Sequence, residues 1–288
     1  MPHVVIDPRN VHDRAITITD PQTLHHLLDV LRVTEGERVD CVDGAGRWYT
    51  ATSRGEAKWR GRVEGLRREL ILDILEQGKE PCSALAIRLV QTLIKPERFD
   101  WLVQKATELG VERMSPVITS RSLIRVRGDS STRPSRISGR MARWRRIATE
   151  AAQQCGRATV PRIDPPAAFE EVLASLDSLG SDPKHSTSEA SRLGSDPTQR
   201  ILQSPAKSLT LLPTLTTPGR SLREVIGDRR NITSSTILIG PEGDFTQGEV
   251  ALAQRYGAVP VSLGRRTLRS ETAAIAVLVV LQHTAGEL

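Results

Sequence analysis

Residues 237–281 read ILIGPEGDFTQGEVALAQRYGAVPVSLGRRTLRSETAAIAVLVVL, and this stretch decides the fold. Its first apolar run, Ile237–Ile239, ends at a Gly-Pro pair, as a buried strand does when it enters a tight loop. A second run, Ala258–Leu263, ends in the same way at Gly264. Each run is followed by a loop and a helical pattern, so the stretch predicts two strand–loop–helix units of an α/β fold.

Two helices are expected within this stretch. Residues Thr246–Glu249 have the spacing of a capping box, so one helix should start there and end near Gly257, a typical C-cap glycine. Ser270 or Thr272 is expected to cap a second helix that includes residues 273–281. That last segment is apolar on every side but only about half as long as a membrane span, so we expect a helix buried on all sides.

Loops at the carboxyl ends of strands are where parallel α/β sheets bind ligands. Three such loops are expected here, after Leu212, at Gly240–Gly243 and at Gly264–Arg269. Their glycines expose backbone amides and carbonyls that can bind an adenine edge and a ribose. The sequence has no P-loop, Rossmann fingerprint, GxSxG nucleophile elbow or metal-ligand spacing, which argues against other common sites.

The chain before this stretch has two parts of different character. Residues 1–75 hold many short strand candidates and a hairpin signal at Asp43-Gly44, which is typical of a small β-barrel. Residues 77–83 are expected to form a linker. Beyond it one βαβ unit is expected, with a strand, a helix and a strand at residues 84–89, 100–109 and 111–118.

Two polar segments interrupt the second part. Residues 121–140 are basic and rich in Ser and Gly, so we expect a mobile loop that leads into a helix at 141–154. Residues 177–208 contain LGSDP twice among polar residues. Such a stretch cannot bury enough apolar surface to order itself, so we interpret it as a disordered insertion in a domain spanning 84–288.

Composition limits the class of protein. The net charge is +6, and arginine supplies most of the positive charge. Arginine suits phosphate and nucleic acid, although a codon-biased genome would produce the same ratio. Three scattered cysteines, no visible signal peptide and no membrane span predict a cytoplasmic protein without a disulfide scaffold or structural zinc.

Four motifs carry a family resemblance: IGPEGDF, LGRRTLRSETA, LVQKATELGV, and EAAQQCGR followed two residues later by VP. Together they resemble the RsmE family, S-adenosylmethionine-dependent methyltransferases of 16S ribosomal RNA in the SPOUT class. Residues 25–51 resemble the PUA-like domain of that family. The resemblance implies a PUA-like RNA-binding β-barrel at 1–75 and, at 84–288, a trefoil-knotted α/β domain with a mostly parallel sheet. It also implies a homodimer.

The resemblance further implies that S-adenosylmethionine binds in the knot and that the product is N3-methyluridine in the RNA of the small ribosomal subunit. Nine cofactor-lining positions carry over: Leu212, Ile239, Gly240, Pro241, Glu242, Gly243, Leu263, Gly264 and Leu268. Two departures stand out. Asp244 occupies a position where the family commonly has Gly, and the N-terminal Met-Pro-His-Val lacks the Arg and aromatic often found there.

The chemistry itself points to arginine. Methyl transfer from a sulfonium is an in-line displacement that needs positioning more than a nucleophilic side chain. Uracil N3 must lose a proton, and a guanidinium near O2 or O4 would favour that loss. Arg269 and Arg157 are the candidates. For Arg269 the alternative is a salt bridge to Glu271 or Glu242, and for Arg157 a structural role is equally supported.

Other roles remain open. Glu242 could act as a base, but acceptance of helix amides explains it better. Arg9, Arg32 and Arg121 are candidate RNA contacts, although a solvated surface accounts for such arginines equally well. Two alternative functions are a methyltransferase acting on another rRNA or tRNA site and a non-catalytic RNA-binding factor in ribosome assembly. The intact GPEG and LRSETA motifs argue against the second.

Overall fold

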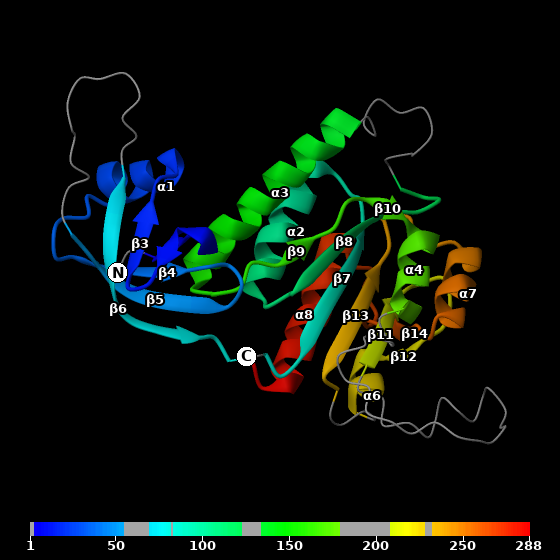
Figure 1. Cartoon of the computed structure of the whole chain (residues 1–288). Coiled ribbons are helices and arrows are strands. Elements are labelled where there is room, and N and C mark those ends of the chain that lie inside the picture. Colours follow the sequence, from blue (N-terminus) through cyan, green and yellow to red (C-terminus); the bar gives the residue numbers. More distant parts are fainter. Residues whose placement is uncertain (1–2, 55–68, 82, 123–133, 179–207, 228–231) are drawn as a thin grey trace. The chain divides into compact units, whose positions relative to one another are not determined.

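The computed structural model describes residues 3–54, 69–81, 83–122, 134–178, 208–227 and 232–288. The chain divides into two compact units (Figure 1). The first consists of Met1–Cys82 and Arg145–Pro161, and the second of Ser83–Trp144 and Arg162–Leu288. The division falls inside one long helix, so each unit is made of two separate segments of the chain.

The first unit is built on a mostly antiparallel sheet, with the order β1-β4-β5-β6-β3-β2 in its described residues. The strands are β1 (His3–Val5), β2 (Val11–His12), β3 (Ala15–Ile18), β4 (Arg38–Val42), β5 (Arg47–Ser53) and β6 (Leu70–Lys79). The short helical segments are η1 (Pro8–Asn10), α1 (Pro21–Leu24) and the π-helical η2 (His25–Val30). Ile16, Leu27, Val39, Leu70 and Leu72 are buried in its core. Many short strands around one core agree with the predicted β domain.

The β4–β5 hairpin forms at the predicted Asp43-Gly44 pair. The Asp43 carboxylate accepts hydrogen bonds from the backbone nitrogens of Ala45 at 2.8 Å and Arg47 at 2.9 Å. Gly44 has a φ of +71°, a conformation that favours glycine. The turn is therefore held by one side chain and one glycine that the sequence already indicated.

A distant segment of the chain completes this hairpin. The Gly46 nitrogen donates to the Ala158 carbonyl at 3.1 Å, and the Val160 nitrogen donates to the Gly44 carbonyl at 2.9 Å. Thr159 forms isolated β-bridges to the same turn. These backbone bonds attach residues 145–161 to the first unit.

Strand β6 is longer than expected. It continues to Lys79, so the linker predicted to begin at Gln77 was placed too early. Gly78 pairs with Trp48, and a Cβ at Gly78 would clash with the indole ring, so the missing side chain lets the two strands stay paired there. The sequence also predicts a strand at Trp59–Leu66, and this segment lies outside the described residues.

The second unit contains a sheet whose described strands are all parallel, in the order β10-β8-β7-β13-β11-β14-β12, with β9 paired to β8. The strands are β7 (Ala86–Thr92), β8 (Arg113–Ile118), β9 (Arg162–Ile163), β10 (Ala167–Ala168), β11 (Ser208–Pro213), β12 (Arg220–Ser221), β13 (Ser234–Ile239) and β14 (Val259–Ser262). The helices are α2 (Pro96–Glu108), α3 (Pro134–Cys155), α4 (Phe169–Ser178), α6 (Leu222–Gly227), α7 (Gln247–Arg255) and α8 (Ser270–Ala285). Parallel strands with helices between them confirm the predicted α/β class.

Helices cover both faces of this sheet. Figure 1 shows α2 and α8 on one side and α4 and α7 on the other. Phe169 of α4 and Phe245, just before α7, stack with ring centroids 5.0 Å apart in a core shared with Val90 and Leu238. On the other side α8 packs against α2 and β13. Burial on both faces explains why the central strands are nearly continuous apolar runs.

Several predicted boundaries in this unit differ from the observed ones, including that of the strand predicted at 84–89, which is Ala86–Thr92. The β7–α2–β8 unit is confirmed, but α2 begins at Pro96, because proline suits the first turn of a helix. Helix α3 begins at Pro134, so the loop predicted to reach residue 140 was drawn too long. Of the insertion predicted at 177–208, the first two residues end α4 and the last begins β11, and 179–207 lie outside the described residues.

Helix α8 is only partly buried. Ala274, Val277 and Leu278 are fully buried, but Val279 and Val280 are 40% and 37% exposed. The prediction of a helix buried on all sides was therefore wrong for one side. Among the described residues no helix combines the length and apolar character needed to cross a membrane.

Candidate active site

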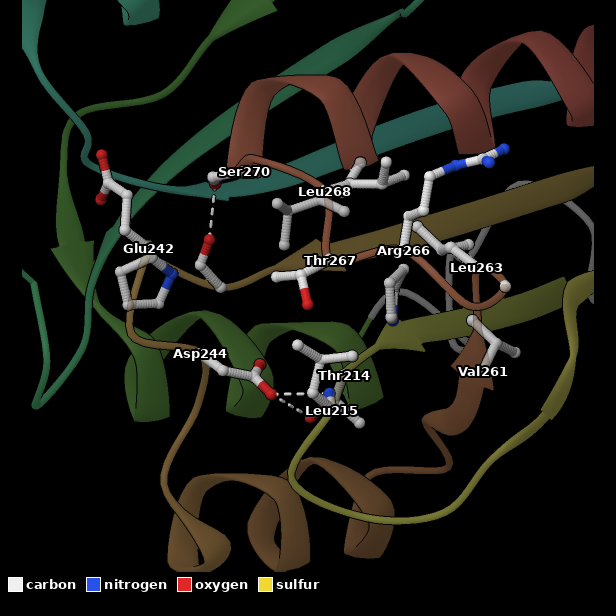
Figure 2. A pocket seen from close by; sticks show the side chains of 16 residues that line it. Thr214, Leu215, Glu242, Asp244, Val261, Leu263, Arg266, Thr267, Leu268 and Ser270 are labelled. Carbon is white, nitrogen blue, oxygen red and sulfur yellow. Dashed lines mark hydrogen bonds between the residues drawn. The ribbon is translucent and has the colours of Figure 1, made fainter.

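A pocket opens at the carboxyl edge of the parallel sheet, where β11, β13 and β14 end (Figure 2). It encloses about 580 Å³ of empty space, open to solvent. Its lining comes from three loops: Pro213, Thr214 and Leu215; Ile239, Gly240, Pro241, Glu242 and Asp244; and Val261, Leu263, Gly264, Arg266, Thr267, Leu268, Ser270 and Ala273. These are the loops that the sequence predicted to converge, because parallel strands end at one edge.

Most of the predicted cofactor positions lie in this pocket. Seven of the nine line it, namely Ile239, Gly240, Pro241, Glu242, Leu263, Gly264 and Leu268. Leu212 does not, because its side chain is fully buried in the core beneath the pocket. Gly243 is also outside the lining, and its carbonyl oxygen accepts a hydrogen bond from Arg121 at 2.7 Å.

The GPEG loop is supported from outside the pocket by the segment that follows β8. The Arg121 guanidinium donates to the Gly243 carbonyl, and the Ser120 nitrogen donates to the Glu249 carboxylate at 2.7 Å. Glu249 also completes the predicted capping box with Thr246. Burial opposes ionisation of Glu249, but the hydrogen bonds from Ser120 and Thr246 outweigh it and lower its pKa. Arg121, predicted as an RNA contact, therefore also supports the loop.

Two loops of the pocket are joined by a chain of buried hydrogen bonds. The Ser270 hydroxyl donates to the Gly240 carbonyl at 2.6 Å and accepts from the Gln91 amide at 2.8 Å. The Thr92 hydroxyl donates to the Ile239 carbonyl at 2.9 Å. Ser270 was expected to cap α8, but the N-cap is Arg269, without a side-chain hydrogen bond. The serine instead links the start of α8 to the GPEG loop.

Arg98 is a site residue that the motifs did not single out. Its Nη1 lies 3.4 Å from Glu242 Oε1, and its Nε lies 3.6 Å from Glu271 Oε1. Glu271 is buried, and its second oxygen has no hydrogen-bond partner among the described residues. Arg98, at the start of α2, thus contacts both the Glu242 carboxylate of the GPEG motif and the Glu271 carboxylate of the LRSETA motif. The only available signal was its position shortly after the end of β7, at the same edge of the sheet.

Arg269 does not form the salt bridge to Glu271 or Glu242 that was the structural alternative for its role. The two glutamates proposed as its salt-bridge partners contact Arg98 instead. Arg269 is exposed, and its side chain makes no hydrogen bond or ion pair with any residue that the structure describes. It lies between Leu268 and Ser270, which both line the pocket. Arg269 itself is not among the residues that line the pocket.

The remaining predicted residues belong to the first unit. Arg157 follows α3, and its guanidinium donates to the Thr159 hydroxyl at 3.0 Å, so it lies in a different unit from Arg269. Arg9 is exposed and paired with Asp7, and this partner lowers the pKa of Asp7 to about 2. Arg32 is exposed with a φ of +54°. None of these geometries by itself assigns an RNA contact.

Comparison with known proteins agrees with this geometry. The chain is 27% identical over 281 residues to the ribosomal RNA small subunit methyltransferase E of Synechocystis sp., covering 96% of this chain and 75% of that protein. It is 25% identical to the protein of the same name from Bacillus subtilis, over 91% of this chain and 88% of the relative. A crystal structure of ribosomal RNA small subunit methyltransferase E from Neisseria gonorrhoeae, bound to S-adenosyl methionine, superposes with a TM-score of 0.71. It is 26% identical and covers 99% of this chain and 98% of its own.

Family models divide the chain in a similar way. An RNA methyltransferase PUA domain matches residues 18–52, within the first unit. An RNA methyltransferase domain matches residues 81–282, which include every residue that lines the pocket. Since that match covers well over half of the sequence, the chain belongs to the family defined by this RNA methyltransferase domain.

Proposed function

We propose that this protein uses S-adenosylmethionine to methylate N3 of a uridine in the 16S RNA of the small ribosomal subunit. The observation that carries the proposal is the pocket formed where the GPEG loop and the 264–269 loop meet. The N-terminal PUA-like domain at 1–75 would bind RNA, and the domain at 84–288 would bind the cofactor. The proposed activity supports a location in the cytoplasm, where ribosomal subunits assemble.

The residues of the pocket fit S-adenosylmethionine. Leu263, Leu268 and Ile239 offer apolar surface for an adenine ring, and Gly264 is exposed, with no side chain to screen its backbone. Glu242 supplies a carboxylate, with its side chain 34% exposed, that suits the positive charge of a sulfonium. When bound, the cofactor supplies an electrophilic methyl group.

Arg269 is our candidate for stabilising the uracil anion. Arg269 is exposed, makes no bond with a described residue and is flanked in the chain by Leu268 and Ser270, which both line the pocket, and this supports the role. A cation near O2 or O4 of the base lowers the cost of removing the N3 proton. Arg157 is a second candidate, which requires that the first unit contribute to catalysis. Glu242 is held by Arg98, which supports a structural role over that of a base.

We also propose that two copies of the chain form a homodimer through α2 and α8. These helices pack against each other and expose Trp101 at 45%, Val279 at 40% and Val280 at 37%. Large apolar side chains exposed on neighbouring helices favour burial against a partner. A trefoil knot in which the last segment threads a loop stays a prediction from the family resemblance.

Mass spectrometry of 16S RNA tests the proposed function. In a deletion strain we expect N3-methyluridine to disappear from the digest, and a plasmid copy of the gene should restore it. An unchanged N3-methyluridine signal would overturn the assignment. Loss of a different modified nucleoside would indicate another rRNA or tRNA site. Calorimetry that shows no binding of S-adenosylmethionine would favour a non-catalytic RNA-binding factor.

A further inference from the structure

Asp244 is an unusual residue in the pocket. Its φ is +58°, in the left-handed region that L-residues other than Asn and Asp rarely adopt. Glycine adopts this conformation without strain, because it has no Cβ. An aspartate here keeps the conformation and adds a carboxylate.

The Asp244 carboxylate accepts most of its hydrogen bonds from one neighbouring loop. Its Oδ2 accepts hydrogen bonds from the Leu215 nitrogen at 2.7 Å, from the Thr214 hydroxyl at 2.8 Å, and from the nitrogen and hydroxyl of Thr216 at 3.0 Å each. Its Oδ1 accepts from the Phe245 nitrogen at 2.8 Å. Figure 2 shows the bonds to Thr214 and Leu215 side by side. The carboxylate therefore joins the loop after β13 to the loop after β11.

The loop after β11 has few other anchors on its pocket side. Leu215 lines the pocket but is 67% exposed, so packing contributes little to its position. The Thr214 nitrogen donates to the Val261 carbonyl at a long 3.3 Å. Hydrogen bonds to an ionised carboxylate are about twice as strong as those between neutral groups. Asp244 thus restrains the wall that Thr214 and Leu215 form, together with the Thr216 hydroxyl, which also lies 2.8 Å from the Phe245 carbonyl oxygen.

We propose that Asp244 is a positioning residue that holds Thr214 and Leu215 in the cofactor-binding conformation, an inference that rests on the function proposed above. If Thr214 and Leu215 hold the binding conformation in only a fraction of the molecules, the apparent affinity for S-adenosylmethionine falls in proportion to that fraction. The effect therefore falls on cofactor binding, and the chemical step at saturating cofactor stays nearly unchanged.

The test compares variants of the full chain by calorimetry with S-adenosylmethionine and by steady-state kinetics. Asp244→Gly keeps the favoured backbone and removes every side-chain bond. We expect its Kd to rise about tenfold and its kcat to stay within about twofold. Asp244→Asn tolerates the same backbone and retains an acceptor oxygen, so it should recover part of the affinity.

A double-mutant cycle isolates the contact itself. Thr214→Val removes the hydroxyl that donates to Asp244 and should weaken binding in the wild-type background, but not further in the Asp244→Gly background. Additive effects of the two substitutions would overturn the proposal, as would a wild-type Kd for Asp244→Gly. Ser235→Ala is the matched control, because its buried hydroxyl bonds the Leu209 carbonyl within the same sheet but does not line the pocket.

The outcomes separate this inference from the proposed function. If the wild-type protein does not bind S-adenosylmethionine, both fall. If the wild type binds and Asp244→Gly binds equally well, the function stands and the role of Asp244 is excluded.

Discussion

The hydroxyl of Ser270 donates a hydrogen bond of 2.6 Å to the carbonyl oxygen of Gly240, and so joins the first turn of α8 to the loop after β13. Both residues line the pocket, and the serine is buried. The bond explains why a serine that looked like a helix cap does not cap. Its oxygen faces a backbone group that would otherwise be buried without a donor.

Ser270→Ala should therefore lower both stability and cofactor affinity. It leaves the Gly240 carbonyl and the Gln91 amide without this partner, which costs about 2 kcal/mol in the free energy of unfolding. Urea denaturation measures the stability, and calorimetry with S-adenosylmethionine measures the affinity. Ser235→Ala should lose comparable stability with an unchanged Kd. Equal affinities for both variants would show that the bond does not shape the pocket.

Arg269→Ala should separate catalysis from binding. We expect turnover to fall by about 100-fold with the Kd for S-adenosylmethionine nearly unchanged, because the guanidinium would act on the uracil and not on the cofactor. Single-turnover methylation of 16S RNA measures the chemical step. Arg255→Ala, an exposed arginine at the end of α7, is the control that removes the same charge elsewhere. Unchanged turnover in Arg269→Ala would exclude the catalytic role.

Acid should destabilise the second unit through Asp164. Its carboxylate accepts from Arg113 Nε at 2.7 Å and Ser115 Oγ at 2.7 Å; burial raises its pKa, but these bonds outweigh burial and lower it below 3.8. A folded-state pKa below the unfolded value stabilises the fold above the unfolded pKa. That contribution is lost as the pH falls through the folded pKa. Denaturation between pH 2 and 7 should show stability declining below about pH 4.

The Asp164→Asn variant tests whether Asp164 causes the loss of stability at acid pH. At neutral pH it should cost about 3 kcal/mol, because Arg88 and Arg113 remain near a position without a carboxylate. Its stability should then depend less on pH than that of wild type over the acidic range. An equal decline in both proteins would assign the acid sensitivity to other carboxylates.

Lysine substitutions on α2 and α8 test the homodimer. Trp101→Lys and Val279→Lys place a charge on exposed apolar positions and should convert dimers to monomers in size-exclusion chromatography with light scattering. Val30→Lys is the control, since Val30 is 57% exposed in the first unit. A wild-type protein that is monomeric at micromolar concentration would contradict the proposal directly.

Local patterns in the sequence predicted much of this structure. The capping box at Thr246, the glycine after α7 and the β7–α2–β8 unit depend on residues close together in the chain, and all three are observed. The convergence of three loops also followed from the rule that parallel strands end at one edge. These features follow from residue types at characteristic spacings along the chain, and such spacings can be read from a single sequence.

The missed features depend on residues far apart in the chain. Arg98 meets Glu242 and Glu271, and Asp244 meets Thr214, across separations that no local pattern records. Ser270 had the residue type of a cap, but a tertiary contact with Gly240 outcompeted the local one. Strand and helix boundaries differ from the predicted ones where contacts between distant residues set them. The end of β6, where Gly78 pairs with Trp48, is one case.

The attachment of residues 145–161 to the first unit has a consequence for exchanging its parts. Ala158 and Val160 form backbone hydrogen bonds with the Gly44 turn, so this unit is not a contiguous N-terminal module. A chain that stops at Cys82 would leave the hairpin without these partners. A chimera that grafts the first unit of a relative onto this enzyme must therefore have three crossovers, one after Cys82 and two that bracket residues 145–161.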